Sequence, residues 1–240
     1  MTQVNKPAAL RLLSALVMKP ALDELAGGLE RATGYKLALA YDSAGAIRKR
    51  VHDAEPADAA LIQRSVLAAL AEQGKIVRGS VVTLARSGIA LAVRKGASKP
   101  GIDSAEALKR ALLAAESVAY PDPALGHAGG EHFRVVLERL GIAAEVDLKA
   151  KLIKSTLPEF AAEDEAALVV IQPMEILATP GYDLVGWLPA ELQDGEKFTW
   201  AVGVTVNAQA PEAAKALIEF LSSPAAAAVI KRRGMEPVAR

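Results

Sequence analysis

Three ionisable side chains could move protons at points where the sequence predicts that a strand ends and a helix begins. They are Asp122, His127 and Glu175. Imidazole is the side chain whose ordinary pKa lies near neutrality, so His127 could give or take a proton without large tuning. Each residue also has a plainer role open to it: an exposed loop histidine, an aspartate that fixes a turn between two prolines, or a glutamate that favours a helix N-terminus.

Small and polar residues at four expected strand-to-helix junctions could bind an anion. Free N–H groups and the positive end of the helix dipole meet at such junctions, and both attract negative charge. The junctions are Ser14–Met18, Asp42–Gly45, Asp122–Gly130 and Gln172–Glu175. Any one of them could be only a helix cap, but four, each after a strand, favour an anion site. The candidate ligand-binding residues are Ser14, Ser43, Ala44, Gly45, Tyr120, Gly126, His127, Ala128, Gly129, Gly130 and Gln172.

Composition removes several classes of function. The 240 residues include 28 basic and 28 acidic side chains, and this balance argues against a nucleic-acid partner, which normally attracts a basic surface. With no Cys there is no disulfide, thiolate nucleophile or Cys-based zinc site. The spacing of His52, His127 and His132 also argues against a metal site made of histidines. We therefore expect no metal and no cofactor.

The first residues lack the pattern of a secretory signal. The apolar run from Pro7 to Val17 is interrupted by Arg11 and followed at once by Lys19-Pro20, whereas a signal needs an unbroken apolar stretch and a small-residue cleavage site. No run approaches the roughly 18–20 apolar residues of a membrane span. We expect a cytoplasmic protein without membrane insertion; a periplasmic location is the alternative if a leader has been removed.

Short apolar runs alternate with segments of helical period along the chain, which predicts α/β units on mainly parallel sheets. Gly34 and Gly141 are placed to end helices, and Ser104 is placed to cap one. The expected strands are Leu10–Leu13, Lys36–Tyr41, Asp58–Ile62, Gly88–Val93, Ser117–Tyr120, Leu168–Ile171, Leu184–Trp187 and Phe198–Val206. The expected helices are Lys19–Thr33, Ala46–His52, Arg64–Glu72, Ala105–Ala115, Gly129–Leu140, Met174–Leu177, Pro211–Leu221 and Pro224–Arg233.

The order and spacing of several short motifs resemble the type 2 periplasmic binding proteins, in the branch of the molybdate-binding proteins. The motifs of the first half are Ala21-Leu-Asp-Glu-Leu-Ala26, Thr33-Gly34, Tyr41-Asp-Ser-Ala-Gly45 and Glu55-Pro-Ala-Asp58. Those further along are Ala119-Tyr-Pro-Asp-Pro123, Leu137-Glu-Arg-Leu-Gly141, Phe220-Leu-Ser-Ser-Pro224 and Arg233-Gly234. No single motif is specific, but their order extends over nearly the whole chain. The chain is also similar to aconitate isomerases, enzymes built on the same scaffold.

This resemblance implies a two-lobed fold, each lobe a mainly parallel sheet flanked by helices, with a ligand cleft between the lobes. One lobe would comprise residues 1–87 and 201–240, and the other residues 88–200. The strands that cross from lobe to lobe would lie near Ser87–Val93 and Phe198–Val206.

The resemblance also suggests particular ligand contacts. Ser43 matches a serine that binds the oxyanion in molybdate-binding relatives, and Gly129 falls where a backbone N–H ligand is supplied. Two positions depart from that pattern. The serine of the first junction aligns near Val17, a few residues after Ser14, and the tyrosine ligand of the relatives corresponds to Gln172. These departures argue against molybdate or tungstate as the ligand.

The expected function is therefore that of a solute-binding receptor for a small anion, an organic carboxylate or polycarboxylate rather than molybdate. If exported, such a receptor would work with an ABC transporter permease. The alternative is an isomerase that moves a proton between carbons of a small unsaturated polycarboxylate. His127, Glu175 or Asp122 would then supply the acid–base group, and N–H donors would hold the carboxylates.

Overall fold

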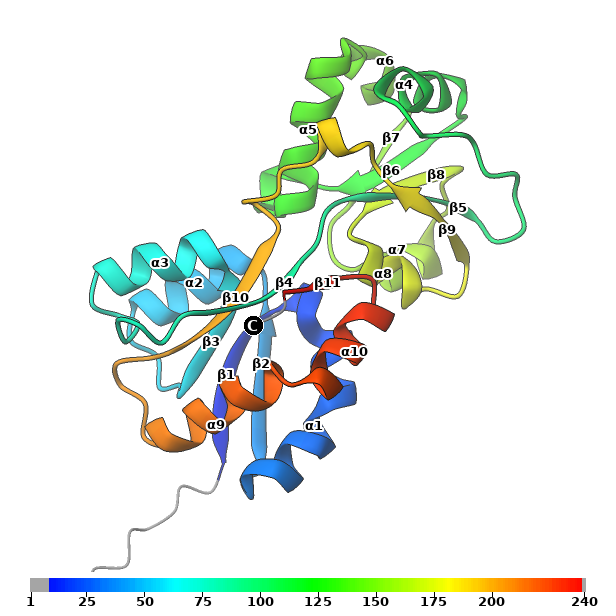
Figure 1. Cartoon of the computed structure of the whole chain (residues 1–240). Helices are drawn as coiled ribbons and strands as arrows, with labels where there is room; N and C mark the ends of the chain where they lie inside the picture. Colours follow the sequence, from blue (N-terminus) through cyan, green and yellow to red (C-terminus); the bar gives the residue numbers. More distant parts are fainter. Residues whose placement is uncertain (1–8, 239–240) are drawn as a thin grey trace, which may run out of the picture. The chain divides into compact units, whose positions relative to one another are not determined.

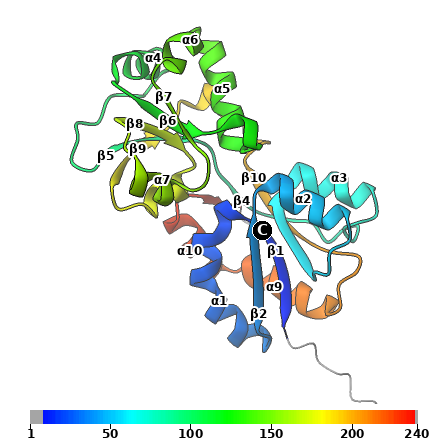
Figure 2. The same ribbon diagram turned by 180° about the vertical axis from the view of Figure 1, so that it is seen from behind.

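The computed structural model describes residues 9–238, and the chain divides into two compact units (Figures 1 and 2). Unit 1 contains the chain up to Arg86 and the chain from Thr199 onward, and unit 2 runs from Ser87 to Phe198. The first and last residues of unit 2 are joined by a hydrogen bond, in which the N–H of Ser87 donates to the carbonyl oxygen of Phe198 at 2.8 Å. The boundaries expected from the sequence, after residues 87 and 200, fall one and two residues later than these.

Unit 1 is built on a mixed sheet with the strand order β11-β4-β10-β3-β1-β2. β1, β2, β3 and β4 run in one direction, and β10 and β11 run in the other. β1 lies between β2 and β3, so Ser14 pairs with both Tyr41 and Leu61. The strands are Leu10–Ala15 (β1), Leu37–Asp42 (β2), Ala59–Gln63 (β3), Val82–Arg86 (β4), Thr199–Val204 (β10) and Glu236–Pro237 (β11).

The helices of unit 1 follow from the order of its strands. The chain moves one way across the sheet from β1 to β2 and the other way from β2 to β3, so right-handed crossovers put α1 and α2 on opposite faces. α1 packs with α9 and α10, and α2 packs with α3. The helices are Lys19–Thr33 (α1), Ala44–His52 (α2), Arg64–Glu72 (α3), Pro211–Leu221 (α9) and Pro224–Arg232 (α10), and the 3-10 turn Leu16–Met18 (η1) precedes α1.

Unit 2 repeats this plan on a mixed sheet with the order β7-β6-β8-β5-β9. β6, β7, β8 and β9 run in one direction and β5 in the other. Both faces of the sheet are buried: β6 directs Val118 and Tyr120 into one apolar cluster and Ala119 into another, as the two-residue period of a strand requires. The strands are Ala90–Arg94 (β5), Val118–Pro121 (β6), Ala150–Ile153 (β7), Leu168–Ile171 (β8) and Tyr182–Trp187 (β9). The helices are Ala105–Ala114 (α4), Ala128–Leu140 (α5), Ala143–Asp147 (α6), Leu157–Glu163 (α7) and Pro173–Leu177 (α8), with 3-10 turns Pro123–Leu125 (η2) and Ala190–Leu192 (η3).

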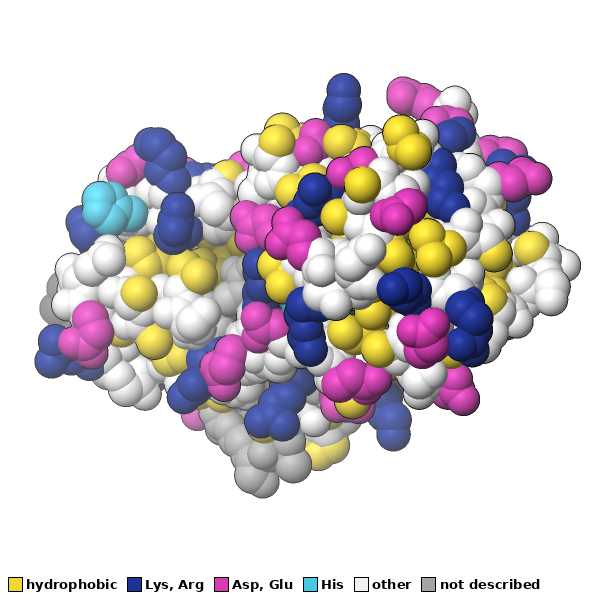
Figure 3. Space-filling model, turned by 90° about the horizontal axis from the view of Figure 1, so that it is seen from above, with side chains coloured by type: hydrophobic (Ala, Val, Ile, Leu, Met, Phe, Trp, Pro, Cys, Tyr) yellow, Lys and Arg dark blue, Asp and Glu magenta, His cyan; other side chains and the backbone are white. Residues whose placement is uncertain are grey.

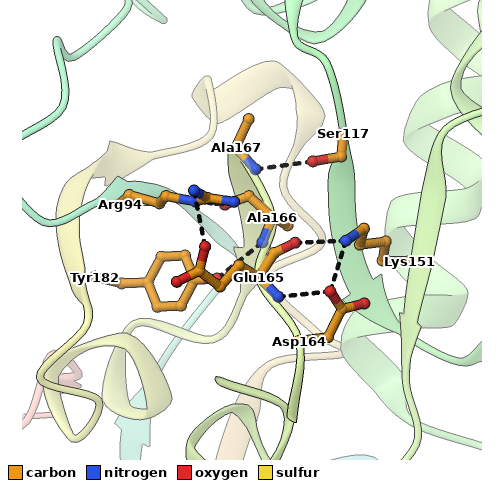
Figure 4. Close-up of polar contacts among 8 residues, drawn as sticks. All are labelled: Arg94, Ser117, Lys151, Asp164, Glu165, Ala166, Ala167 and Tyr182. Carbon is orange, nitrogen blue, oxygen red and sulfur yellow. Dashed lines mark hydrogen bonds and ion pairs between the residues drawn. The ribbon is translucent and has the colours of Figure 1, made fainter. Parts of the chain in front are cut away.

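Polar contacts hold the segment that leads into β8 (Figure 4). Lys151 of β7 reaches Oδ1 of Asp164 at 2.6 Å and the carbonyl oxygen of Glu165 at 2.7 Å. Arg94 of β5 pairs with the Glu165 carboxylate at 2.8 Å. The next two N–H groups donate to side-chain hydroxyls, Ala166 to Tyr182 at 3.1 Å and Ala167 to Ser117 at 3.0 Å. These contacts hold the start of β8, a strand of four residues that ends at the junction that carries Gln172.

The α/β class expected from the sequence is confirmed, and most strands of each sheet share a direction. The ranges Lys19–Thr33, Arg64–Glu72, Leu168–Ile171 and Pro211–Leu221 agree residue for residue with the expected elements. The sequence analysis missed β4, α6, β7, α7 and β11, which are two to seven residues long. Segments this short repeat their apolar positions too few times for a period to show.

No single helix within residues 9–238 is both long and apolar enough to cross a membrane. α9 and α10 reach that length and composition only as a pair, with a bend of 62° between them. Both helices bury apolar side chains in unit 1, including Leu217 and Ile230. Residues 1–8, which contain the start of the apolar run considered as a secretory signal, lie outside the described residues.

Candidate functional site

In both units the first strand of the parallel part of the sheet lies between the next two such strands. β1 lies between β2 and β3, and β6 lies between β7 and β8. The connections therefore leave the carboxyl end of the middle strand in opposite directions, and ligands of open α/β sheets bind in the crevice at such a point. We call these places the unit 1 edge, formed by Ser14, Ser43–Gly45 and Gln63, and the unit 2 edge, formed by Asp122, His127–Gly130 and Gln172.

At the unit 1 edge, Ser43 is the N-cap residue of α2. Its hydroxyl oxygen accepts the N–H of Ala46 at 3.2 Å, and its own N–H donates to Oδ1 of Asp42 at 2.7 Å. The first-turn N–H groups of Ala44 and Gly45 have no acceptor among the residues that the structure describes. Ser43 therefore caps the helix with its oxygen and still has a hydroxyl hydrogen to offer, alongside two free N–H groups.

Ser14 lies at the carboxyl end of β1 and is fully buried. Its hydroxyl donates to the carbonyl oxygen of Ala15 at 3.2 Å. Val17, the position that aligns with the first-junction serine of the molybdate-binding branch, lies in η1 and is buried as well. The middle strand of unit 1 thus ends in side chains that are enclosed by the sheet and its neighbours.

A cation that the sequence analysis did not select lies beside the unit 1 edge. Lys19 begins α1, with Nζ 2.6 Å from Oδ2 of Asp23 and 4.8 Å from the centroid of the Tyr41 ring. Tyr41 donates its hydroxyl to Oδ1 of the same aspartate at 2.7 Å. Burial and the Asp23 carboxylate together raise the pKa of Tyr41. The spacing of Lys19 and Asp23, one helical turn apart, was the sequence signal for this cluster.

A groove of about 520 Å³ lies elsewhere in unit 1, between α2 and α3. Arg48, Lys49 and His52 line one wall, and Ser65 and Val66 lie on the other. It contains none of the residues of the unit 1 edge. Charged side chains of both signs are mixed over the face of the molecule in Figure 3, with apolar side chains between them, as the equal numbers of acidic and basic residues lead one to expect.

In unit 2 the chain makes a tight turn between β6 and α5. Oδ1 of Asp122 accepts the N–H of Ala124 at 2.9 Å and so caps η2. Gly126 follows with a φ of 72°, a left-handed conformation that costs little only for glycine. Asp122 and Gly126, both selected as candidate site residues, are therefore engaged in shaping the turn that sets the start of α5.

Two glycines allow the first turn of α5 to pack closely against the end of β6. A Cβ on Gly130 would lie 2.0 Å from the carbonyl oxygen of Pro121, and a Cβ on Gly129 would lie 2.8 Å from Oε1 of Gln172. Gly130 therefore needs glycine for space because it faces backbone, whereas a side chain at position 129 would displace the end of the Gln172 side chain. The N–H groups of Ala128, Gly129 and Gly130 have no acceptor among the described residues. This helix start accordingly presents free donors next to a polar side chain.

That side chain, Gln172, follows β8 and precedes α8. β8 pairs with β6 in the sheet, and this pairing brings the end of β8 to the start of α5. Gln172 is 7% exposed, and its carboxamide forms no hydrogen bond with any residue in the described part of the chain. The structure thus brings together two of the selected candidates, Gln172 and Gly129, that lie far apart in the sequence.

His127 is the N-cap residue of α5, but its ring does not cap the helix. The side chain is partly buried and makes no hydrogen bond with the described residues. Burial lowers the pKa of His127, while the carboxylates of Asp122 and Glu131 act in the opposite direction. The imidazole is therefore mainly uncharged at neutral pH and can accept a proton, close to N–H groups able to hold a carboxylate.

The remaining two candidates are engaged away from the unit 2 edge. Tyr120 stacks edge-on against Phe133 in the apolar core, with ring centroids 5.1 Å apart, and its hydroxyl lies 3.5 Å from Oδ1 of Asp147. Glu175 accepts the N–H of Leu157, the first residue of α7, at 3.3 Å. Burial raises the pKa of Glu175 to about 7. Its carboxyl group therefore caps α7, and it carries a proton for part of the time at neutral pH.

No cluster of three or more side chains suited to hold a metal ion occurs among residues 9–238. His132 is buried and donates from Nε2 to the carbonyl oxygen of Leu192 at 2.7 Å, with its ring against Phe198. His52 lies 3.3 Å from Asp53 on the surface of unit 1. Each of these two histidines is therefore accounted for by local contacts.

The fold and the two edges define a class of protein, and the comparison with known families agrees with it. Residues 10–236 match the family of bacterial extracellular solute-binding proteins. This chain belongs to that family, and its fold is that of the type 2 periplasmic binding proteins, as the sequence indicated.

Particular relatives fall into two groups, solved structures and characterised proteins. The fold is similar to the substrate binding domain of a putative molybdenum ABC transporter from Clostridium difficile, with a TM-score of 0.76, 17% identity, and coverage of 96% of this chain and 99% of that one. It is also similar to the periplasmic molybdate-binding protein of Azotobacter vinelandii, with a TM-score of 0.73, 19% identity, and coverage of 96% and 99%.

A characterised relative is more similar in sequence. This chain is 37% identical over 236 residues to an aconitate isomerase from a Pseudomonas species, and the alignment covers 95% of this chain and 88% of that protein. The sulfate-binding protein SubI of Mycobacterium tuberculosis shares the fold at 17% identity, with a TM-score of 0.71 and coverage of 97% and 88%. The fold is thus shared with proteins named for small anions, and the sequence is similar to that of a protein named for an isomerisation.

Proposed function

We propose that this protein is an isomerase of the aconitate type, which binds a small unsaturated polycarboxylate and moves a proton between two of its carbons. The observation that carries the proposal is the unpaired imidazole of His127 at the free N-terminus of α5. The sequence analysis placed a receptor first and an isomerase second. Similarity to an aconitate isomerase over 95% of the chain supports the reverse order.

Each edge by itself offers hydrogen-bond donors to a carboxylate. Ser43 and the N–H groups of Ala44 and Gly45 offer one set in unit 1. The first turn of α5 and the Gln172 amide offer another in unit 2. Hydrogen bonds to a charged group are about twice as strong as those between neutral groups, and a polycarboxylate can accept several of them at once.

The proton shift needs a base, a place for the electrons and a route back for the proton. His127 takes a proton from the methylene carbon that lies between a carboxylate and the double bond. The electron pair moves the double bond by one carbon, and the negative charge that develops spreads onto a carboxylate held by N–H donors. The imidazolium then returns the proton to the former vinylic carbon. Atoms and electrons balance within the substrate.

A receptor without turnover is the second candidate. The match to a family of extracellular solute-binding proteins favours it, and the same donors would serve it. Such a receptor would pass a small polycarboxylate to an ABC permease, and His127 would then be at most a ligand contact.

One experiment separates the two. The purified protein is incubated with cis-aconitate and, separately, with trans-aconitate in deuterated water, and the proton NMR spectrum is followed. An isomerase converts each acid into the other, and deuterium enters the product to the extent that the proton held by His127 exchanges with solvent before it is returned. Binding seen by calorimetry without interconversion or exchange would establish the receptor and remove the isomerase.

A further inference from the structure

Two buried polar atoms of unit 1 lack a hydrogen-bond partner within the described residues. They are Oε1 of Gln63 and Nε1 of Trp200. Gln63 is 7% exposed and Trp200 is 2% exposed. Leaving a buried donor or acceptor unpaired is costly, so such groups in a folded protein call for a reason. Here one is an acceptor and the other a donor.

The two residues face each other across the sheet. Gln63 ends β3, and Trp200 of the antiparallel strand β10 is its direct partner in the register. Directly opposed residues of an antiparallel pair direct their side chains to the same face, with Cβ atoms about 4.5–5.5 Å apart. A rotamer of Gln63 that brings Oε1 to the indole N–H would satisfy both atoms together.

Gln63 also stands at the unit 1 edge. It follows Leu61, which pairs with Ser14 at the end of the middle strand, and it precedes the first residue of α3. Its side chain does not cap α3, so the first N–H groups of that helix receive no side-chain acceptor from it. Its amide nitrogen forms no hydrogen bond with the residues described. Unlike Oε1, this nitrogen is not fully shielded from solvent.

Unit 2 has the same arrangement at the corresponding place. Leu61-Ile62-Gln63 ends the strand beside β1, and Val170-Ile171-Gln172 runs to the junction after the strand beside β6. Gln172 already lies over the free N-terminus of α5. Each switch point is therefore flanked by a glutamine with an unpaired carboxamide.

We propose that Gln63 is a ligand-binding residue, whose amide N–H donates to a carboxylate of the bound polycarboxylate, and that Trp200 positions it by donating its indole N–H to Oε1. This inference rests on the proposed function and adds a carboxylate-binding group to the unit 1 edge, beside Ser43 and the free N–H groups of α2. An amide that donates to an anion has a more strongly accepting carbonyl oxygen, because hydrogen bonds in a chain polarise one another. Ligand binding and the Trp200–Gln63 bond then reinforce each other.

The fluorescence and N–H resonance of the Trp200 indole can report ligand binding directly. The chain holds two tryptophans, so a Trp187→Phe background leaves Trp200 as the single source of indole signals. In this background, cis-aconitate, trans-aconitate and molybdate are each titrated while tryptophan emission and the indole ¹⁵N–H resonance are recorded, and affinities are measured by calorimetry. We expect the indole resonance of Trp200 to move on binding, as it does when the N–H gains an acceptor.

The variant Gln63→Leu removes the carboxamide at nearly constant size, and Gln73→Leu at the exposed end of α3 is the matched control. We expect Gln63→Leu to weaken binding about tenfold or more, since a hydrogen bond to a charged group is lost, and to abolish the indole shift. Gln73→Leu should change neither. If Gln63→Leu were too unstable to study, Gln63→Asn, which keeps the amide but shortens its reach, should weaken binding and reduce the shift in the same way.

The outcomes separate this inference from the proposed function. Wild-type binding of a polycarboxylate that Gln63→Leu leaves unchanged overturns the role of Gln63 while the function stands. Binding of molybdate alone removes the proposed substrate class and still tests Gln63, by the same loss in the leucine variant. Binding of none of the three overturns both.

Discussion

The two edges share a plan and differ in chemistry. In each unit a central strand is flanked by two parallel neighbours, and a glutamine lies at the end of one flanking strand, as its last residue in β3 and directly after β8. In unit 1 the neighbouring helix start carries Ser43, whose oxygen caps α2. In unit 2 the helix that follows the central strand, α5, begins with Gly129 beside the Gln172 side chain and Gly130 against the Pro121 backbone. It is preceded by the imidazole of His127, which does not cap it.

The two edges therefore differ in whether their side chains can exchange a proton near neutral pH. The side chains of the unit 1 edge are serines and a glutamine, and none of these titrates near neutral pH. They can hold a charge but cannot move a proton. The unit 2 edge holds His127, whose pKa is lowered by burial. On the proposed function, the group that moves the proton therefore lies in unit 2.

The largest effect is expected from removing the imidazole of His127, which tests whether the proton-transfer group lies in unit 2. His127→Ala should lower turnover of aconitate by a factor of about 10²–10⁴, the usual contribution of a general base, while binding largely survives. His52→Ala, an exposed histidine of unit 1, is the control and should leave turnover unchanged. Turnover is followed by NMR and binding by calorimetry. Full activity in His127→Ala would assign the base elsewhere.

Close packing at the start of α5 can be tested against the open start of α2. Gly130→Ala would place a Cβ 2.0 Å from the carbonyl oxygen of Pro121, and we expect it to lower the free energy of unfolding by about 3 kcal/mol, at the upper end of overpacking costs. Gly45→Ala meets nothing within 4 Å and should be neutral or stabilising by up to about 1 kcal/mol. Urea denaturation measures both, and equal effects would contradict the difference in packing.

A third test concerns how the free energy of unfolding depends on pH because of Glu175 in unit 2. Burial raises the pKa of Glu175 from 4.5 to about 7, so the folded state binds more protons than the unfolded state between these values. Stability should therefore fall as pH rises from about 4.5 to 7, by about 3 kcal/mol in total.

The variant Glu175→Gln keeps an acceptor for the N–H of Leu157 and removes the charge. It should be more stable than wild type at pH 8, and this advantage should shrink as pH falls and disappear below pH 4.5, where the wild-type carboxyl is protonated in both states. Urea denaturation at both pH values measures the difference. An advantage that does not change with pH would show that Glu175 is not protonated in the folded protein near neutrality.

The smallest effect is expected from Ser43→Ala, which tests whether Ser43 binds the ligand or only caps α2. Ser43→Ala should weaken ligand binding about tenfold, by loss of one hydrogen bond to a charged group, and should also destabilise the protein by about 1 kcal/mol through loss of the cap. Ser104 caps α4 with the same geometry, accepting the N–H of Ala107 at 3.2 Å. Ser104→Ala should show the loss of stability without the loss of affinity. If the two variants bind alike, Ser43 is only a cap.

Much of the local structure could be predicted from the sequence because its signals lie within a few residues. The apolar period of Lys19–Thr33 and the left-handed Gly34 after it define α1 to the residue. Ser104 and Gly141 mark a helix start and a helix end in the same way. A helix bonds each residue to one four positions away, so its pattern and its caps are contained in a short window of sequence.

The candidate site was predicted only in part. The junctions that carry Ser43, His127 and Gln172 could be selected, because residue types that bind anions followed expected strands. Tyr120 and Glu175 were selected on the same reasoning, yet one packs in the core and the other caps α7. Position next to a junction does not fix the direction in which a side chain points, since that depends on the neighbouring elements.

The sequence by itself determined the α/β class, most elements and the residue types available at each junction. The tertiary structure alone decided which junctions meet. The contact of Gln172 with Gly129 and the opposition of Gln63 and Trp200 arise from strand pairing between residues far apart in the sequence. Strand order and register depend on contacts between elements rather than on a local period, so they leave no trace in any short window of the chain.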